Sequence, residues 1–145
     1  STLEDRFPHP YTRADADRWL ASLAEQDPTT QFVIAANDDL VGGIGLRLLE
    51  DVYRGTTEIG YWLGEDFWGR GLATRVVRAF CPWVFENFAV ERIEARVFST
   101  NPASCRVLEK AGFNREGRLR HSVLKMNVLM DQVVYAILRG ESSTP

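Results

Sequence analysis

The sequence predicts a single α+β domain in which a mixed sheet is flanked by helices. Three observations lead to this fold class. Apolar and polar residues alternate in several short segments, as in half-buried strands, whereas in others apolar residues recur every three or four positions, as in amphipathic helices. The segments follow the order helix, hairpin, strand, helix, strand, helix, hairpin, which favours a sheet with helices on its faces. A length of 145 residues suits one domain.

The first half of the chain predicts one helix and three strands. Residues 14–26 have the helical pattern, with apolar side chains on one face. Residues 31–36 and 40–49 are strand-like on either side of a polar turn at Asn37, Asp38 and Asp39. Glycines inside the second of these strands indicate a bulge or close packing, and they are Gly42, Gly43 and Gly45. Residues 57–63 are expected to form the central strand after a polar connection.

The second half predicts two helices and three strands. Residues 72–88 carry apolar side chains at intervals of four and are expected to form an amphipathic helix. Residues 92–98 alternate as a strand. Asn101 is typical of a helix N-cap, and Gly112 of the residue after the helix end. Residues 119–138 are interpreted as two strands with a turn near Met126 and Asn127.

The strongest functional signal is the glycine-containing segment from Phe67 to Thr74, between the central strand and the longest helix. A turn there exposes backbone N–H groups at the positive end of the helix dipole, which suits a pyrophosphate. Gly69 and Gly71 allow an anion to approach the main chain closely, and Arg70 adds a positive charge. Thr74 stands where a dinucleotide fingerprint needs glycine, and no Gly-Lys-Ser/Thr follows as in a Walker A loop.

A second motif further along the chain helps to interpret the glycine-containing segment. Residues 101–113 read Asn-Pro-Ala-Ser-Cys-Arg-Val-Leu-Glu-Lys-Ala-Gly-Phe. Together with Glu58-Ile-Gly-Tyr-Trp-Leu upstream and the glycine loop, they resemble the GNAT N-acetyltransferases, RimJ/RimL type, over roughly residues 14–138. Trp68 departs from the Gln or Arg of the general GNAT loop pattern, but the form Phe67-Trp-Gly-Arg-Gly is similar to the RimJ/RimL-type branch. The resemblance implies the GNAT fold, a central, mostly antiparallel mixed sheet with flanking helices, and the family's first strand is expected to be absent from this chain.

The resemblance also implies acetyl-CoA as co-substrate, with no metal. The pyrophosphate is expected on the N–H groups of the glycine loop, and the pantetheine arm beside the end of the central strand, where a main-chain N–H could stabilise the oxyanion. Asn101 is the expected contact from the other side. The cofactor-binding residues are therefore Trp62, Leu63, Trp68, Gly69, Arg70, Gly71, Leu72, Ala73, Thr74, Asn101 and Ser104.

Three residues are candidates for chemistry. Glu58 is the candidate general base, directly or through a water, with a pKa that partial burial would raise. Ser104 is the candidate donor to the departing sulfur, and Tyr61 a weaker candidate for positioning or proton donation. Structural alternatives remain for each: an ion pair of Glu58 with Arg47 or Arg54, a plain first-turn serine, and packing of the tyrosine. Likewise, the glycines could serve only a tight turn and Asn101 only a cap.

Composition limits the class of protein further. A net charge of −3 argues against general nucleic-acid binding, and no apolar run is long enough to span a membrane. Cys81 and Cys105 lack a His/Cys cluster and are interpreted as reduced thiols of a cytoplasmic protein. The terminal hairpin offers strands for a possible homodimer.

Two functions of different classes remain open at the level of sequence. The first is transfer of an acetyl group to a primary amine, either a protein or peptide N-terminus or a small amine, by direct attack in a ternary complex. The expected acceptor loops contain no acidic cluster suited to a polyamine. The alternative is a non-catalytic acyl-CoA-binding sensor, which would need the glycines and Asn101 but neither Glu58 nor Ser104. A scaffold protein with a chance glycine pair would require several coincidental motifs.

Overall fold

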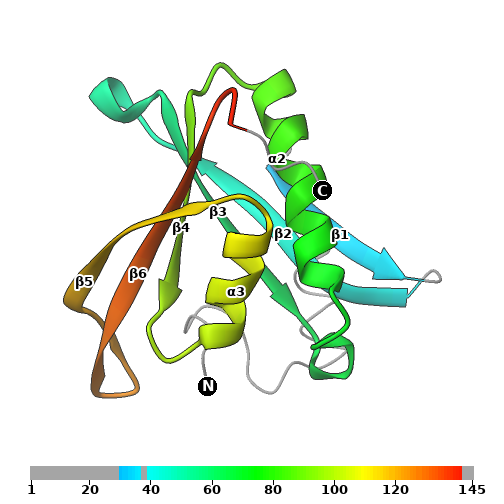
Figure 1. Cartoon of the computed structure of the whole chain (residues 1–145), viewed down its shortest axis with the longest axis vertical. Helices are drawn as coiled ribbons and strands as arrows, with labels where there is room; N and C mark the ends of the chain where they lie inside the picture. The colour runs from blue at the N-terminus through cyan, green and yellow to red at the C-terminus, as the bar shows by residue number, and fades with distance from the viewer. Residues whose placement is uncertain (1–29, 37–38, 142–145) are drawn as a thin grey trace.

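The computed structural model describes residues 30–36 and 39–141, which form a twisted sheet covered by helices on one face (Figure 1). Its elements in chain order are β1 (Gln31–Ala36), β2 (Asp39–Leu48), η1 (Asp51–Tyr53), β3 (Thr56–Leu63), η2 (Glu65–Phe67), α2 (Leu72–Asn87), β4 (Arg92–Phe98), α3 (Pro102–Lys110), β5 (Asn114–Lys125) and β6 (Val128–Leu138).

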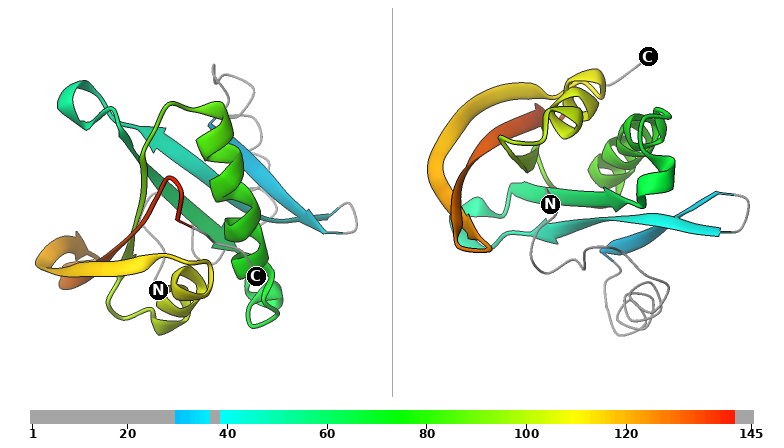
Figure 2. Two further views of the ribbon diagram at one scale, coloured as in Figure 1. Left: turned by 45° about the horizontal axis from the view of Figure 1, so that its top comes forward. Right: turned by 90° about the horizontal axis from the view of Figure 1, so that it is seen from below.

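The six described strands form one sheet in the order β1-β2-β3-β4-β6-β5. Every neighbouring pair is antiparallel except β3 and β4, which are parallel. A parallel pair needs a crossover connection, and α2 provides it. Figure 2 shows α2 and α3 on the same side of the sheet. The mixed, mostly antiparallel sheet with flanking helices expected from the sequence is confirmed.

The parallel strands β3 and β4 diverge soon after they begin. Their pairing is confined to Thr56–Glu58 against Arg92–Glu94, although both strands continue beyond it. The second half of β3 therefore has β2 on one edge and no described strand on the other. This divergence leaves backbone groups of β3 available beside the start of α3.

The hydrophobic core lies between the sheet and the two helices. α2 buries Val77, Cys81 and Val84, which follow helical spacing, against the sheet. α3 buries Leu108, and the sheet contributes fully buried side chains such as Ile93. α3 follows β4 in the chain and contacts both β4 and β5.

Most predicted elements are confirmed, with differences at their ends. The prediction that the terminal hairpin begins at Leu119 is wrong, because β5 starts at Asn114. The polar connection before the central strand contains the η1 turn, and Asp39 belongs to β2 rather than to a turn. The predicted helix over residues 14–26, the rest of that turn and the expected absence of the family's first strand all concern residues outside the described ones.

Candidate active site

The loop between β3 and α2 requires two glycines for its own backbone. Gly64 starts the loop by donating its N–H to the Val41 carbonyl at 2.9 Å. Gly69 and Gly71 have φ values of 76° and 72°, in the left-handed region where a Cβ is strained. Gly71 is the N-cap of α2 and has no side chain to cap the first turn. The first N–H groups of α2 therefore lie uncapped at the positive end of the helix dipole.

The second motif begins α3 as predicted. Asn101 is the N-cap, and its Oδ1 accepts the backbone N–H of Ser104 at 3.1 Å. Pro102 takes the first helical position, where the lack of an N–H has no cost. Gly112 follows the helix end with a φ of 98°. The cap fixes Ser104 in the first turn of α3, so its side chain has a defined place relative to β3.

Two of the candidate catalytic residues meet through their hydroxyl groups. Tyr61 Oη and Ser104 Oγ lie 2.7 Å apart, although 43 positions separate these residues in sequence. Burial raises the pKa of Tyr61 to about 12, and the hydrogen bond with Ser104 offsets part of the rise. Tyr61 therefore keeps its proton at neutral pH, and one hydroxyl of the pair donates to the other.

A cavity of about 320 Å³ brings the two motifs together. It lies between the end of β3, the glycine loop and the first turns of α3. Eleven predicted site residues line it: Tyr61, Trp62, Leu63, Trp68, Gly69, Gly71, Leu72, Ala73, Thr74, Asn101 and Ser104. Two predicted residues, Glu58 and Arg70, do not line it, and the guanidinium of Arg70 lies 5.5 Å from the centre of the Phe67 ring.

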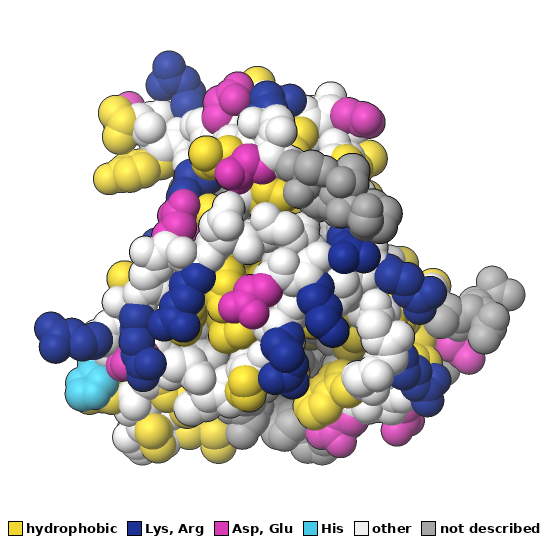
Figure 3. Space-filling view, in the orientation of Figure 1, with side chains coloured by type: hydrophobic (Ala, Val, Ile, Leu, Met, Phe, Trp, Pro, Cys, Tyr) yellow, Lys and Arg dark blue, Asp and Glu magenta, His cyan; other side chains and the backbone are white. Residues whose placement is uncertain are grey.

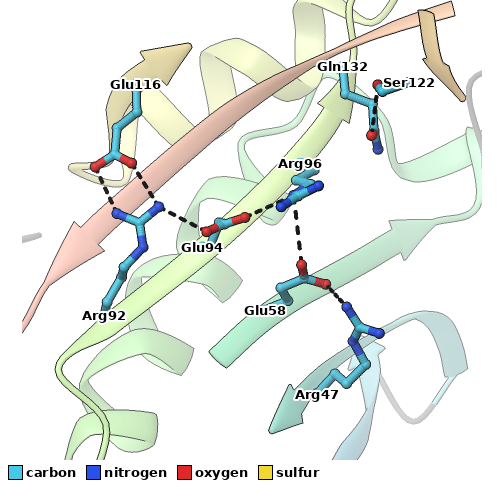
Figure 4. Close-up of polar contacts among 8 residues, drawn as sticks. All are labelled: Arg47, Glu58, Arg92, Glu94, Arg96, Glu116, Ser122 and Gln132. Atoms are coloured by element: carbon cyan, nitrogen blue, oxygen red, sulfur yellow. Dashed lines mark hydrogen bonds and ion pairs between the residues drawn. The ribbon is translucent and has the colours of Figure 1, made fainter. Parts of the chain in front are cut away.

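Glu58 belongs to an ion-pair chain whose members lie on four strands of the sheet, β2, β3, β4 and β5 (Figure 4). Its carboxylate pairs with Arg47 on β2 and, at 3.7 Å, with Arg96 on β4. Arg96 also pairs with Glu94, which continues the chain to Arg92. The predicted alternative of an ion pair with Arg47 is thus present. The chain joins β3 to β4 where the two strands begin to diverge.

Sequence reasoning missed one wall of the cavity. Ala103, Arg106, Val107 and Lys110 line it from α3, together with Phe67 from the loop. The spacing of the four helix residues places them on one face of α3, so the helical period starting from Asn101 could have identified them. The space-filling view from the helical side shows Lys and Arg side chains gathered over α3 and the adjoining end of α2 (Figure 3). Arg106 and Lys110 therefore give the cavity a basic edge.

Across residues 30–36 and 39–141, no three His, Cys, Asp or Glu side chains are grouped so that they could hold a metal ion. Within those same residues, neither helix is long and apolar enough to cross a membrane.

A family model described as an acetyltransferase (GNAT) domain matches residues 2–114. The chain belongs to the GNAT acetyltransferase family.

Relatives support the same assignment. The chain is 36% identical over 122 residues to the uncharacterised N-acetyltransferase YoaA of Bacillus subtilis, covering 83% of this chain and 68% of YoaA. It is 30% identical over 114 residues to the ribosomal-protein-serine acetyltransferase of Escherichia coli, covering 79% of this chain and 63% of that protein. Among solved structures it is similar to Mycobacterium smegmatis RimJ in complex with CoA-disulfide, with a TM-score of 0.76, 26% identity, and coverage of 90% of this chain and 65% of RimJ. The chain thus spans about two thirds of the length of these relatives, and the RimJ/RimL-type resemblance is confirmed.

Proposed function

We propose that this domain transfers the acetyl group of acetyl-CoA to a primary amine by direct attack within a ternary complex. The observation that supports it best is the cavity, which joins an uncapped helix N-terminus at one end to the hydroxyl pair of Tyr61 and Ser104 at the other. An acyl-CoA has a diphosphate and a thioester separated by an extended arm, so it needs these two features at two ends of one cavity. RimJ, a similar structure, is described in complex with a CoA-disulfide.

The diphosphate end of this proposal rests on backbone donors and basic side chains. The N–H groups of Leu72, Ala73 and Thr74 belong to the uncapped first turn of α2. Arg106 and Lys110 line the same cavity from α3 and add positive charge for phosphate groups. Gly69 and Gly71 leave room for close approach, because nothing lies within 4 Å of the place where a Cβ would stand.

At the thioester end, Ser104 donates a hydrogen bond to the departing sulfur. Tyr61 remains protonated, and either hydroxyl of the pair can donate to the other. In this proposal Tyr61 is the donor, so the Ser104 O–H is free to donate to the sulfur. A hydroxyl is a weak acid but a suitable donor to a developing thiolate. The proton that the thiolate finally takes comes through this pair or from water.

Proton removal from the amine is assigned to Glu58 acting through water, since Glu58 does not line the cavity. Replacing Glu58 by Gln should lower kcat by about a hundredfold at neutral pH and leave acetyl-CoA affinity nearly intact. Because this change also breaks the pairs with Arg47 and Arg96, Arg47→Gln is the matched control: it removes an ion pair but keeps the carboxylate. Equal losses in both variants would remove Glu58 from the role of base.

The acceptor in this proposal is a peptide N-terminus or a small amine. Its support is the similarity to a ribosomal-protein-serine acetyltransferase. A cytoplasmic location is also part of the proposal, and it rests on the free thiols Cys81 and Cys105.

The first experiment is a titration of intrinsic tryptophan fluorescence with acetyl-CoA, because Trp62 and Trp68 line the cavity. Free CoA and a nicotinamide dinucleotide are the controls. Saturable micromolar binding of acetyl-CoA without a response to the dinucleotide is the expected result. Incubation with peptides and small amines then follows, with release of the CoA thiol as the measurement. Binding without transfer to any amine would favour the sensor, and absence of binding would refute the proposal.

A homodimer through the terminal hairpin is a further part of the proposal. Leu124, Met126, Val128 and Leu129 at the hairpin tip are all more than half exposed. Exposed apolar side chains at the end of an edge hairpin favour contact with a second copy. Light scattering of the purified protein should give twice the chain mass, and Leu129→Arg should reduce it to the monomer. A monomeric wild type would remove this part of the proposal.

A further inference from the structure

Trp68 reaches back from the glycine loop to the strand that the loop follows. Its indole Nε1 donates a hydrogen bond to the Leu63 carbonyl at 2.9 Å. Yet the residue is 52% exposed, so burial of the ring does not account for its position. Trp68 also stands where the general family pattern has Gln or Arg. The hydrogen bond is therefore the specific feature of this side chain.

The backbone of Leu63 lies on the open edge of β3. Gly64 donates its N–H toward β2, to Val41, and amide groups alternate between the two edges of a strand. The N–H and C=O of Leu63 and of Tyr61 consequently point the other way, toward the side of β4. Because β4 pairs with β3 only up to Glu58, these amides face the cavity rather than a described strand. Trp62, by contrast, directs its carbonyl toward Gly42 on β2.

Trp68 therefore changes what the edge of β3 offers to a ligand. It occupies the Leu63 carbonyl and leaves the Leu63 N–H as the last donor before the glycine turn. An extended ligand lying along this edge can accept the Leu63 N–H, and the next N–H along the chain, that of Gly64, is already donated to Val41. The main-chain pairing between such a ligand and β3 thus ends at Leu63.

Trp68 is held by its backbone as well. Phe67 donates its N–H to Gly64 at 3.0 Å, and Trp68 donates its own to Glu65 at 3.2 Å, which closes the η2 turn. Gly69 follows directly, and the uncapped first turn of α2 begins three residues later. The indole bond to Leu63 thus fixes the start of the loop against the end of β3.

We propose that Trp68 is a positioning residue for the acyl-CoA. Its indole sets the distance between the Leu63 N–H, which holds a pantetheine carbonyl, and the loop N–H groups, which hold the diphosphate. This inference rests on the proposed function, since it concerns how the same site measures the length of that ligand. It predicts that Trp68 matters only to a ligand long enough to reach both places.

The test compares two ligands in wild type and Trp68→Phe, which keeps an aromatic ring but removes the N–H. Acetyl-CoA has the diphosphate and acetyl-pantetheine lacks it. Dissociation constants from calorimetry should rise about tenfold for acetyl-CoA and less than twofold for acetyl-pantetheine, the size expected for one hydrogen bond. The KM for acetyl-CoA should rise together with its dissociation constant. Trp83→Phe is the matched control, because Trp83 packs against Phe32 and Phe80 away from the cavity and should leave both constants unaltered.

Each other outcome counts against the proposal. Equal losses of affinity for both ligands would mean that Trp68 contacts the pantetheine arm or is needed for folding. No loss of affinity for either ligand would mean that its hydrogen bond does not contribute to binding. Failure of wild type to bind either ligand would refute the proposed function itself. The hydrogen bond from Trp68 to Leu63 is tested separately by proton NMR. A Trp68 indole proton that exchanges quickly with solvent would refute this bond and, with it, the positioning role.

Discussion

At the scale of single residues, the hydroxyl pair is the feature with the clearest kinetic consequence. Ser104→Ala removes the donor to the departing sulfur and should lower kcat about a hundredfold with little change in the KM for acetyl-CoA. Tyr61→Phe keeps the ring in place and removes only the partner of Ser104, so its loss should be smaller, about tenfold. Steady-state kinetics of the two variants show whether kcat falls more in Ser104→Ala than in Tyr61→Phe.

The double variant provides the control for this pair. If Tyr61 acts through Ser104, adding Tyr61→Phe to Ser104→Ala should cost almost nothing more, because the shared interaction is already lost. Independent, multiplying effects would contradict a common role. The pKa of Tyr61 is raised to about 12, so Tyr61 stays protonated up to about pH 9, roughly 3 units lower. The pH–rate profile between about pH 6 and pH 9 should therefore contain no step from Tyr61.

Cys81 gives a residue-scale prediction about alkaline stability. Burial raises the pKa of its thiol from 9.0 to about 12. Between these values the unfolded chain releases the thiol proton and the folded chain retains it, so stability falls as pH rises. At about pH 10 this one group should cost the folded protein about 1.4 kcal/mol relative to neutral pH.

Urea unfolding of wild type and Cys81→Ala at neutral pH and near pH 10 measures this effect. The variant should be less stable at neutral pH because it leaves a small cavity, but it should lose about 1.4 kcal/mol less on alkalinisation. Cys105→Ala is the control, since that thiol is only partly buried. An identical pH dependence in Cys81→Ala and wild type would show that the buried thiol does not stay protonated.

At the scale of elements, the close approach of β2 and β3 depends on Gly42. A Cβ at this position would overlap the backbone carbonyl of Trp62 and the side chain of Leu63. Gly42→Ala should therefore destabilise the protein by about 3 kcal/mol, as overpacking does, and disturb the end of β3 that borders the cavity. Thermal unfolding with a measurement of acetyl-CoA affinity tests both effects.

Two other glycines serve as controls for Gly42. At Gly45 the overlapping atoms belong to the flexible end of the Gln31 side chain, which can move aside, so Gly45→Ala should cost less. At Gly55 nothing lies within 4 Å of the added Cβ, and Gly55→Ala should change stability by less than about 0.5 kcal/mol. A similar cost at all three positions would contradict close packing as the cause.

The comparison of sequence with structure is also informative at this scale. The predicted strands at residues 31–36 and 92–98 have the bounds of β1 and β4, and β3 begins one residue before the predicted 57–63, because flanking turns mark these segments. The start of β5 was not, since Asn114, Arg115 and Glu116 are all exposed on this edge strand and show no alternation of apolar residues. Local patterns identify elements with one buried face, but an exposed edge strand is defined by pairing with its neighbour.

The candidate site divides in the same way. The glycine loop and the cap at Asn101 are local features, and sequence spacing was enough to predict them. The contact between Tyr61 and Ser104 depends on where β3 ends relative to α3, which no local pattern specifies. The α3 residues that line the cavity follow the helical period counted from Asn101, so they could have been predicted. That Glu58 does not line the cavity depends on how β3 packs in three dimensions.

At the scale of the whole molecule, an ion-pair chain holds the diverging strands together. Arg92 and Arg96 on β4 both pair with Glu94, Arg96 reaches Glu58 on β3, and Arg92 reaches across to Glu116 on β5. Figure 4 shows these groups in one continuous row. Glu94 is its most buried carboxylate, with a side chain only 12% exposed. The width of the opening between β3 and β4 therefore depends on charge as well as on packing.

Acid should weaken this arrangement at Glu94. Burial alone would raise the pKa of its carboxyl, but hydrogen bonds from Arg92 and Arg96 outweigh burial and lower it below the usual 4.5. The folded-state pKa is thus depressed, so the stabilisation is present above the unfolded value and is lost as pH falls through the folded value. Glu94→Gln should destabilise the protein by about 3 kcal/mol at neutral pH, and this difference should shrink progressively below pH 4.5.

Urea unfolding of both proteins at neutral pH and at about pH 3, which lies below the usual pKa of glutamate, measures the two differences. Glu86→Gln is the matched control, because Glu86 is exposed on α2 and makes no ion pair with a described residue. That change should have almost no effect at either pH. A cost of Glu94→Gln that stays constant with pH would mean that the glutamate stabilises the sheet by shape and hydrogen bonding rather than by charge. The opening between β3 and β4 would then be maintained without a contribution from charge. In that case, salt should not change the acetyl-CoA affinity by weakening these ion pairs.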